Sequence, residues 1–440
     1  MVKSNSNIFK IGSLGIQHVL AMYAGAILVP LIVGGALGLD GEQLTYLVSI
    51  DILTSGIATL LQVYSNKFTG IGLPIMLGCT FTAVPPMISI GGEYGISSIY
   101  GSIIVSGIIV VLISTFFGKL VRFFPPVVTG SVVTIIGITL IPVAINNLAG
   151  GDQGAPDFAS SQNILLGFGT LLIIILLYKF SSGFLRAISV LIGIIVGTVA
   201  AYFMGMLDFT EMTNADWFHL PKPFYFGVPT FEITPIIIMT LVAIVSLVES
   251  TGVYFALGDI CDKEIKEKDL VKGYRAEGLA SVIGGLFNAF PYTTFSQNVG
   301  LLQITGVKSK KVIYAAVMFL VILGLIPKMG ALATIIPTSV LGGAMVAMFG
   351  MVATAGIKML SRVNFDRQEN MFIIAISIGL GLGVTVVPDL FKSLPSNLAI
   401  ITNSGIVMGS LSAIFLNILF NMIPGKKKAM LEENQAKKVS

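Results

Sequence analysis

The chain has 440 residues, of which 55% are hydrophobic and 11% are charged, and its mean hydropathy is +0.92. This composition excludes an ordinary soluble globular protein. Apolar runs of about 20 residues recur along the whole chain and indicate an all-α polytopic membrane protein within a lipid bilayer. The formal net charge of +4 comes from basic residues scattered among short loops, so it indicates membrane topology and no nucleic-acid partner.

The N-terminal residues Met1–Lys10 are polar and lead into a full-length apolar run, so we expect no cleavable signal peptide. Cys79 lies in an apolar run and Cys261 in a charged loop, so we expect no disulfide. Hydropathy predicts about fourteen membrane spans. Their approximate positions are 14–36, 43–64, 70–92, 97–117, 121–147, 162–180, 184–206, 234–258, 275–291, 293–306, 310–327, 330–356, 369–387 and 399–424.

The distribution of basic residues orients these spans. With the N-terminus inside the cell, almost all lysines and arginines fall in cytoplasmic segments, and Lys222, Lys328 and Lys392 are the exceptions. Because basic residues near span ends are retained on the cytoplasmic side, we expect a multi-pass protein of the cell membrane with both termini in the cytoplasm.

Irregular features recur in the two halves of the chain. Span 5 opens at Pro125 and span 12 at Pro337, an offset of 212 residues (337 − 125). Polar broken segments around Thr80 in span 3 and Gln297 in span 10 are offset by 217 residues (297 − 80). Seven spans per half is an odd number, so the repeats are inverted relative to each other. We expect repeats at 1–207 and 234–424, an extracellular linker at 208–233 and a cytoplasmic tail at 425–440.

The segment from Phe290 to Gly300 is polar and proline-broken, although hydropathy places it deep in the bilayer. Irregular backbone is tolerated there only where it lines a cavity within the protein. Broken segments at matching positions of inverted halves mark the binding site of a transporter. We therefore predict a binding site near the midplane, built from this segment and the Gly78–Thr82 segment.

Glu249, deep in span 8, is the most informative single residue. An isolated carboxylate at mid-bilayer costs roughly 2.5–3.5 kcal/mol, so Glu249 must face a partner or a cavity. We expect it to bind substrate and to exchange protons, with an interhelical hydrogen bond as the alternative. The amides of Gln297 and Asn298 suit the edge of a planar heterocycle, and Phe295 could stack on such a ring. Alternatively, the two amides only satisfy a helix break.

Other polar residues within the spans have weaker claims. His18 is the only histidine in a span, and bracing of a neighbouring helix is the favoured interpretation over proton coupling. Glu277 can form a local ion pair with Arg275 or Lys272, or take part in proton relay or gating. Asp51 is a second buried acid or a packing contact, and Thr80 either contacts substrate or eases helix packing. The sequence contains no metal-ligand cluster, nucleotide loop or nucleophile triad, so we expect no enzyme, no metal and no cofactor.

Three separated motifs resemble those of the nucleobase–ascorbate transporter family. They are Gln297-Asn298-Val299-Gly300 followed by Thr305, Gln17-His18 in span 1, and Glu249-Ser250-Thr251-Gly252 in span 8. The resemblance runs the full length of the chain. Glutamine at position 297 is similar to the xanthine and urate group of the family, whereas uracil-type members usually carry glutamate there.

The resemblance implies a 7+7 inverted-repeat fold, with a core of spans 1–4 and 8–11 and a gate of spans 5–7 and 12–14. Short strands in spans 3 and 10 would meet at the substrate, and members are commonly homodimers coupled to protons or, less often, sodium. By position, Glu249 and Gln297 would bind a purine through side chains, Phe81 and Ser296 through main chain, and Phe295 by packing on the ring. Glu277 matches an acidic position of the family.

We therefore expect proton-coupled uptake of an oxidised purine, xanthine or urate. The alternatives are a uracil or broad nucleobase permease, an anion transporter of the same architecture, and an intramembrane enzyme.

Overall fold

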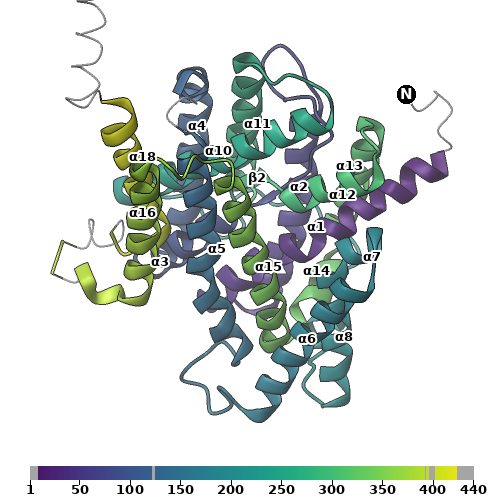
Figure 1. Cartoon of the computed structure of the whole chain (residues 1–440). Coiled ribbons are helices and arrows are strands. Elements are labelled where there is room, and N and C mark those ends of the chain that lie inside the picture. Colours follow the sequence, from purple (N-terminus) through teal and green to yellow (C-terminus); the bar gives the residue numbers. More distant parts are fainter. Residues whose placement is uncertain (1–7, 121–123, 392, 396–401, 424–440) are drawn as a thin grey trace, which may run out of the picture. The chain divides into compact units, whose positions relative to one another are not determined.

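The computed structural model describes residues 8–120, 124–391, 393–395 and 402–423 (Figure 1). The contacts divide the chain into two compact units, which are considered separately. The first comprises residues 1–118 and 140–350, and the second residues 119–139 and 351–440. These units follow contacts and do not test the predicted repeats or the core and gate, which stay predictions. The predicted tail at 425–440 lies outside the described residues.

The first unit contains most of the helices and both strands. Its elements are α1 (Ile8–Ala36), α2 (Gly41–Val63), β1 (Leu77–Cys79), the 3₁₀ turn η1 (Phe81–Ala83), α3 (Val84–Tyr94), α4 (Ile96–Leu120), α6 (Ser161–Phe180), α7 (Gly183–Ala187), α8 (Ser189–Phe203), α9 (Thr210–Asn214), α10 (Ile233–Ile260), α11 (Glu267–Leu286), β2 (Tyr292–Thr294), α12 (Ser296–Thr305), α13 (Lys310–Gly324) and α14 (Pro327–Thr334). Three helices, α4, α5 (Pro126–Leu148) and α15 (Thr338–Leu360), belong partly to each unit.

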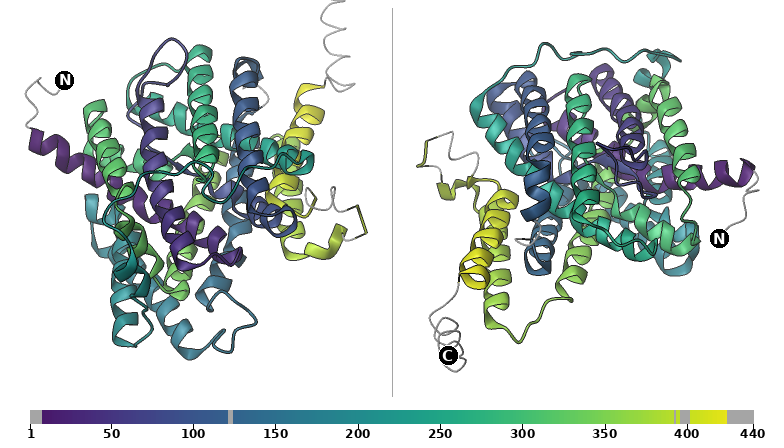
Figure 2. Two further views of the ribbon diagram at one scale, coloured as in Figure 1. Left: turned by 180° about the vertical axis from the view of Figure 1, so that it is seen from behind. Right: turned by 90° about the horizontal axis from the view of Figure 1, so that it is seen from above.

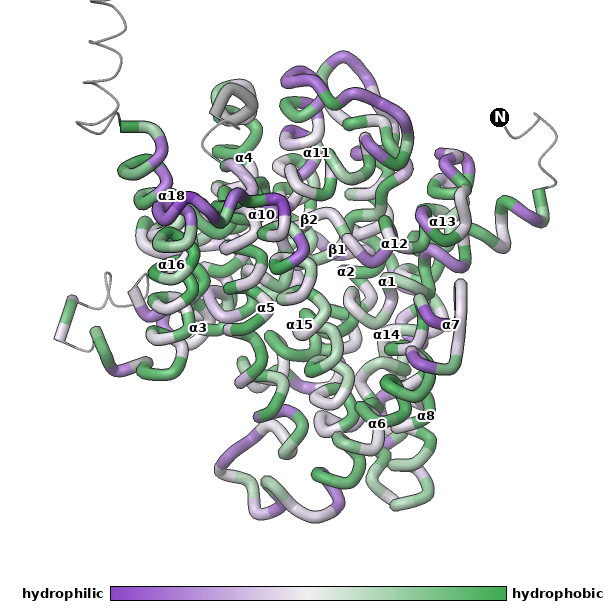
Figure 3. Tube along the Cα trace, viewed as in Figure 1, coloured by the Kyte–Doolittle hydropathy of each residue, from purple (hydrophilic) through white to green (hydrophobic). Residues whose placement is uncertain are grey.

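Within the described ranges, nine helices are long and apolar enough to cross a membrane, and a tenth span results if α13 and α14 are counted together. Among the remaining predicted spans, α11 is a continuous helix of 20 residues that is less apolar, and the others are short or broken elements. One face of α6 exposes apolar side chains at helical spacing, including Leu165, Phe168 and Leu172, which suits contact with lipid. Figure 3 shows α6 and α8 as mostly hydrophobic tubes.

Local sequence explains where several helices begin and end. A capping box starts α2, because the Asp40 carboxylate accepts from the Gln43 backbone N–H at 2.9 Å and the Gln43 side chain accepts from Asp40 at 3.1 Å. Gly306, with a φ of 65°, ends α12 in the left-handed conformation that glycine favours. The first turns of α1 project from the other helices of the first unit (Figure 2), and Ile8 and Phe9 are exposed there.

The predicted start of span 12 at residue 330 is wrong, whereas its predicted opening at Pro337 agrees with the start of α15. Residues Pro327–Thr334 form a separate helix, α14, bent by 80° from α13, and α15 begins only at Thr338. The reason is local. Proline has no N–H to donate and restricts the residue before it, so Pro327 and Pro337 each interrupt the helical run.

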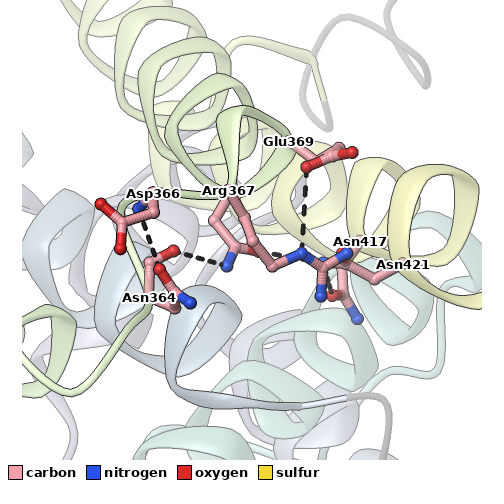
Figure 4. Close-up of polar contacts among 7 residues, drawn as sticks. Asn364, Asp366, Arg367, Glu369, Asn417 and Asn421 are labelled. Atoms are coloured by element: carbon pink, nitrogen blue, oxygen red, sulfur yellow. Dashed lines mark hydrogen bonds and ion pairs between the residues drawn. The ribbon is translucent and has the colours of Figure 1, made fainter.

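The second unit contains α16 (Gln368–Val386), the 3₁₀ turn η3 (Pro388–Phe391), α18 (Gly405–Asn417) and the π-helical turn η4 (Ile418–Met422). The helices α16 and α18 pack closely, because a Cβ on Gly381 would lie 3.1 Å from the Gly405 carbonyl oxygen. Polar side chains connect their ends, as Figure 4 shows. Arg367 donates to Asn421 Oδ1 at 2.9 Å, and its Nε lies 3.9 Å from Glu369.

Candidate functional site

The two broken segments meet in a short antiparallel sheet. Leu77 pairs with Thr294, Gly78 with Thr293 and Cys79 with Tyr292. The pairing continues at both ends, where Thr80 N–H donates to Pro291 O at 2.9 Å and Phe295 N–H donates to Met76 O at 3.0 Å. These bonds satisfy backbone groups that would otherwise be unpaired inside the membrane. The predicted pairing of strands from spans 3 and 10 is confirmed.

Helices of the first unit surround this strand crossing. The helices α1 and α2 contact β1, and α10 and α11 contact β2 (Figure 1). The Thr59 hydroxyl of α2 accepts from Leu77 N–H at 2.9 Å. Phe295 packs its ring on the glycines of two elements, since a Cβ on Gly78 would lie 2.5–2.8 Å from three of its ring carbons and one on Gly25 3.1 Å from the nearest. Phe295 is buried by these contacts.

Glu249 lies on α10 beside the strand crossing. One turn before it, Ser246 Oγ lies 3.4 Å from Thr80 Oγ1, just beyond β1. Directly after it, Ser250 Oγ lies 3.0 Å from Thr293 Oγ1 and 3.3 Å from Thr294 Oγ1, on β2. In the chain, Glu249 thus lies between two serines of α10, one bonded to Thr80 just beyond β1 and the other bonded to β2.

The residues at the strand crossing differ sharply from one another in their exposure. The two strands and Thr80, Phe81, Thr82, Phe295 and Asn298 are buried, whereas Glu249 and Gln297 are half-buried and Ser296 is exposed. The accessible polar groups at the crossing are thus a carboxyl, an amide and a hydroxyl. Ser296 is also the first residue of α12, where backbone N–H groups have no partner within the helix. The short helix α12 therefore begins at the residue before Gln297.

Glu277 lies in the middle of α11 and is buried. Tyr254 of α10, one turn beyond Ser250, donates to Glu277 Oε1, and the Gln62 side chain of α2 donates to the Tyr254 hydroxyl. The alternative of a local ion pair with Arg275 is not supported, because the Arg275 guanidinium donates instead to Ser114 and Thr115 of α4 at 3.1 and 2.9 Å. Whether Glu277 takes part in proton relay stays a prediction.

Asp51 is fully buried in α2 and faces β2. The Tyr292 hydroxyl donates to Asp51 Oδ1 at 3.0 Å and also contacts Thr54 Oγ1. Asp51 thereby holds the end of β2 against α2. This bond to a strand residue suits structural support.

His18 and Asn298 form a pair between α1 and α12. Asn298 Nδ2 donates to the His18 carbonyl at 2.9 Å and lies 3.2 Å from His18 Nδ1, and both side chains are buried. This contact is the helix brace that was the favoured interpretation of His18. Asn298 Oδ1 has no partner among the described residues. The Phe81 ring packs edge-on against Phe349 of α15, with centroids 5.3 Å apart.

Several residues of the site carried no assigned role in the sequence analysis. Tyr292, Tyr254 and Gln62 link the carboxyls to the helices, and Ser246 and Ser250 link α10 to the strands. For the three residues on α10, the signal in the sequence was their spacing from Glu249. Ser246 and Ser250 lie within four residues of it, and Tyr254 follows Ser250 by four.

Comparisons with known proteins were consistent with this architecture. The family model Xan_ur_permease, described as "Permease family", matches residues 9–390. The chain is 64% identical over 424 residues to a xanthine permease of Bacillus subtilis (strain 168). The match covers 96% of this chain and 97% of that protein. It is 61% identical over 419 residues to the uric acid permease PucK of the same organism, with 95% and 97% covered.

A solved structure shows the fold. The transmembrane domain of BicA, a cyanobacterial bicarbonate transporter, matches with a TM-score of 0.64 over 92% of this chain and 97% of that one, at 16% identity. The predicted class, an all-α polytopic membrane protein of the 7+7 type with two short strands, is confirmed. The resemblance carried by the three motifs is confirmed as well: the chain belongs to the nucleobase–ascorbate transporter family, whose members are transporters and not enzymes.

Proposed function

We propose that the chain imports a purine base, xanthine or urate, together with a proton, by alternating access. The position of Glu249 carries this proposal. Glu249 is half-buried on α10, and the nearby serines of the same helix bond to Thr80 and to β2. Relatives named as xanthine and uric acid permeases, at 61–64% identity, support the choice of purine.

The chemistry of the accessible groups fits an oxidised purine. Xanthine and urate present adjacent N–H and C=O groups along their ring edges. The Gln297 amide can donate to a carbonyl and accept from an N–H, and the Glu249 carboxyl can accept from a ring N–H. Main-chain groups of Phe81 and Ser296, at the starts of η1 and α12, supply further bonds. Thr80 and Asn298 support the two segments from behind.

Proton coupling follows from the charge of Glu249. An ionised carboxyl is costly at this depth. Protonation of Glu249 therefore favours the step in which the substrate-loaded protein closes its site to one side and opens it to the other. Release of the proton to the cytoplasm then weakens substrate binding. The coupling ion is H⁺ and not sodium. A carboxyl at the site disfavours an anion such as sulfate, despite the fold shared with a bicarbonate transporter.

The topology belongs to the same proposal. Both termini lie in the cytoplasm of a cell-membrane protein, and the 208–233 linker is extracellular. The core of spans 1–4 and 8–11 carries the strand crossing and moves against a gate of spans 5–7 and 12–14, within a homodimer. Glu277, linked to α10 through Tyr254, relays the proton toward the cytoplasmic side.

Uptake of radiolabelled xanthine tests the proposal. Glu249→Gln should abolish accumulation against a gradient, because the amide cannot exchange a proton. The matched control is Glu232→Gln, which removes an exposed carboxylate at the start of the same helix and should leave uptake unchanged. Full accumulation by Glu249→Gln would exclude the coupling role.

Gln297→Glu tests recognition. Loss of one donor to the purine should weaken xanthine uptake by about tenfold, the order of one unsatisfied buried hydrogen bond. Competition by unlabelled xanthine, urate, uracil, guanine and sulfate identifies the substrate class. Strong competition by sulfate, or by uracil alone, would contradict the purine assignment.

A further inference from the structure

A separate cavity of about 450 Å³ lies in the first unit, away from the strand crossing. Three elements form it: the first turns of α2, the linker from α9 to Tyr225, and Pro327 at the start of α14. The linker is held in place there. The Tyr46 hydroxyl donates to the Lys222 carbonyl at 2.8 Å, and the backbone N–H of His219 donates to the Leu325 carbonyl at 3.2 Å.

The cavity is strongly acidic. Asp40, Glu42, Glu211 and Asp216 line it, and Lys222 is the one ammonium group among the lining residues. Burial lowers the pKa of His219, so that side chain is neutral near pH 7. Three of the carboxylates have a local explanation, since Asp40 caps α2, and Glu42 and Glu211 lie in the first turns of α2 and α9, where negative charge is favourable. Asp216 comes from the linker and has no such role.

An unsatisfied hydroxyl points to a ligand. Thr45 lines the cavity with only 6% of its surface exposed, and its Oγ1 has no hydrogen-bond partner among the described residues. A buried hydroxyl without a partner is destabilising, because it has lost its bonds to water without replacing them. A ligand with N–H donors would satisfy both this oxygen and the carboxylates.

The arrangement favours an extended cation over a metal ion. In the described part of the chain, no three His, Cys, Asp or Glu residues converge as metal ligands, so the negative charge is spread around the cavity. Tyr46 and Tyr225 stack at 3.8 Å with an angle of 13° between their rings, and they add an aromatic wall. Separated carboxylates and an aromatic surface suit ammonium groups joined by methylenes.

We propose that this cavity binds a small organic polycation of the diamine or polyamine class, with its ammonium groups on Glu211, Asp216 and the Thr45 hydroxyl. The Lys222 ammonium occupies part of the same acidic field and competes with the ligand. The site is independent of purine transport, and its occupancy stabilises the linker against α2 and α14.

A built-in reporter allows a direct test. Trp217 is the only tryptophan of the chain, is exposed, and adjoins Asp216. The purified full-length protein in detergent is titrated with putrescine and spermidine while Trp217 emission is recorded. A saturable change is expected, and NaCl or choline chloride at matched ionic strength should not reproduce it. The same response to the salts would overturn the proposal, because it would reflect charge screening alone.

Variants give the test two directions. Glu211→Gln and Thr45→Val should each weaken spermidine binding, by about tenfold for one charge-assisted bond, whereas Lys222→Gln should strengthen it. Glu232→Gln, an exposed acid of the same unit outside the cavity, is the control and should leave binding unchanged. Equal affinity for the original chain, Glu211→Gln and Lys222→Gln would overturn the proposal even if one variant folds poorly.

Discussion

At the scale of single residues, the strand crossing depends on the absent side chain of Gly78. The Phe295 ring occupies the space where a Cβ would lie. Gly78→Ala should therefore displace the ring, destabilise the protein by about 1–3 kcal/mol and reduce uptake. Gly92→Ala in α3, where a Cβ meets nothing within 4 Å, is the control and should be neutral or slightly stabilising. Thermal unfolding in detergent measures both, and equal melting temperatures would contradict the packing argument.

Residue identity alone located part of the site. Glu249 and Gln297 stand out because a carboxyl or amide is costly at bilayer depth. Tyr292 and Tyr254 do not, because an aromatic side chain in an apolar span is typical of ordinary core packing. Only the folded chain shows that their hydroxyls bind Asp51 and Glu277. The two residues of these bonds are 241 and 23 positions apart, and contacts between separate elements leave no periodic signal in the sequence.

At the scale of elements, the linker before α10 should respond to pH through His219. Its ring nitrogen bonds to Gly324 O at 3.2 Å, and burial lowers its pKa below the ordinary 6.5. In the released linker, His219 has its ordinary pKa and binds a proton more readily than in the docked linker. Docking is therefore fully stable above pH 6.5 and weakens as the pH falls below that value.

Limited proteolysis of the linker between pH 5 and pH 7.5 measures this effect. Cleavage should become faster below about pH 6.5 in the original chain. His219→Gln keeps a donor for the Gly324 carbonyl and cannot titrate, so its cleavage should depend less on pH. An identical pH profile for the variant would assign the effect to another group.

Hydropathy predicted the long helices well and their interruptions less well. Runs such as α2 and α10 appear close to their expected positions because about 20 apolar residues leave few alternatives. The separate helix α14 was missed because it stands between two longer apolar helices, α13 and α15, and hydropathy averages over such a short element. The prolines at 327 and 337 were visible, but the 80° bend depends on packing of α14 against α2 and α9.

At the scale of the whole molecule, each predicted repeat supplies one strand of the crossing. A chain cut after Gly205, an exposed loop between α8 and α9, leaves β1 and β2 on different fragments. Neither fragment alone should transport xanthine, whereas co-expression of residues 1–205 and 206–440 should restore uptake and allow the fragments to be purified together.

The same fragments with Glu249→Gln in the second are the control and should associate without accumulating xanthine. Uptake by one fragment alone would contradict a site shared between the halves. The pairing of β1 with β2 and the membership of the family were within reach of the sequence, whereas the contacts of α10 with both strands required the structure.

The strand pairing also orders events during synthesis. Leu77 leaves the ribosome and enters the membrane long before Thr294 is translated, so β1 must wait with unpaired backbone groups while more than two hundred residues are inserted. Thr59 offers it a temporary partner, since its hydroxyl already accepts from the Leu77 N–H. A nascent carrier interrupted before β2 would hold an exposed polar edge within the bilayer, and such an edge would identify it to membrane quality control as unfinished.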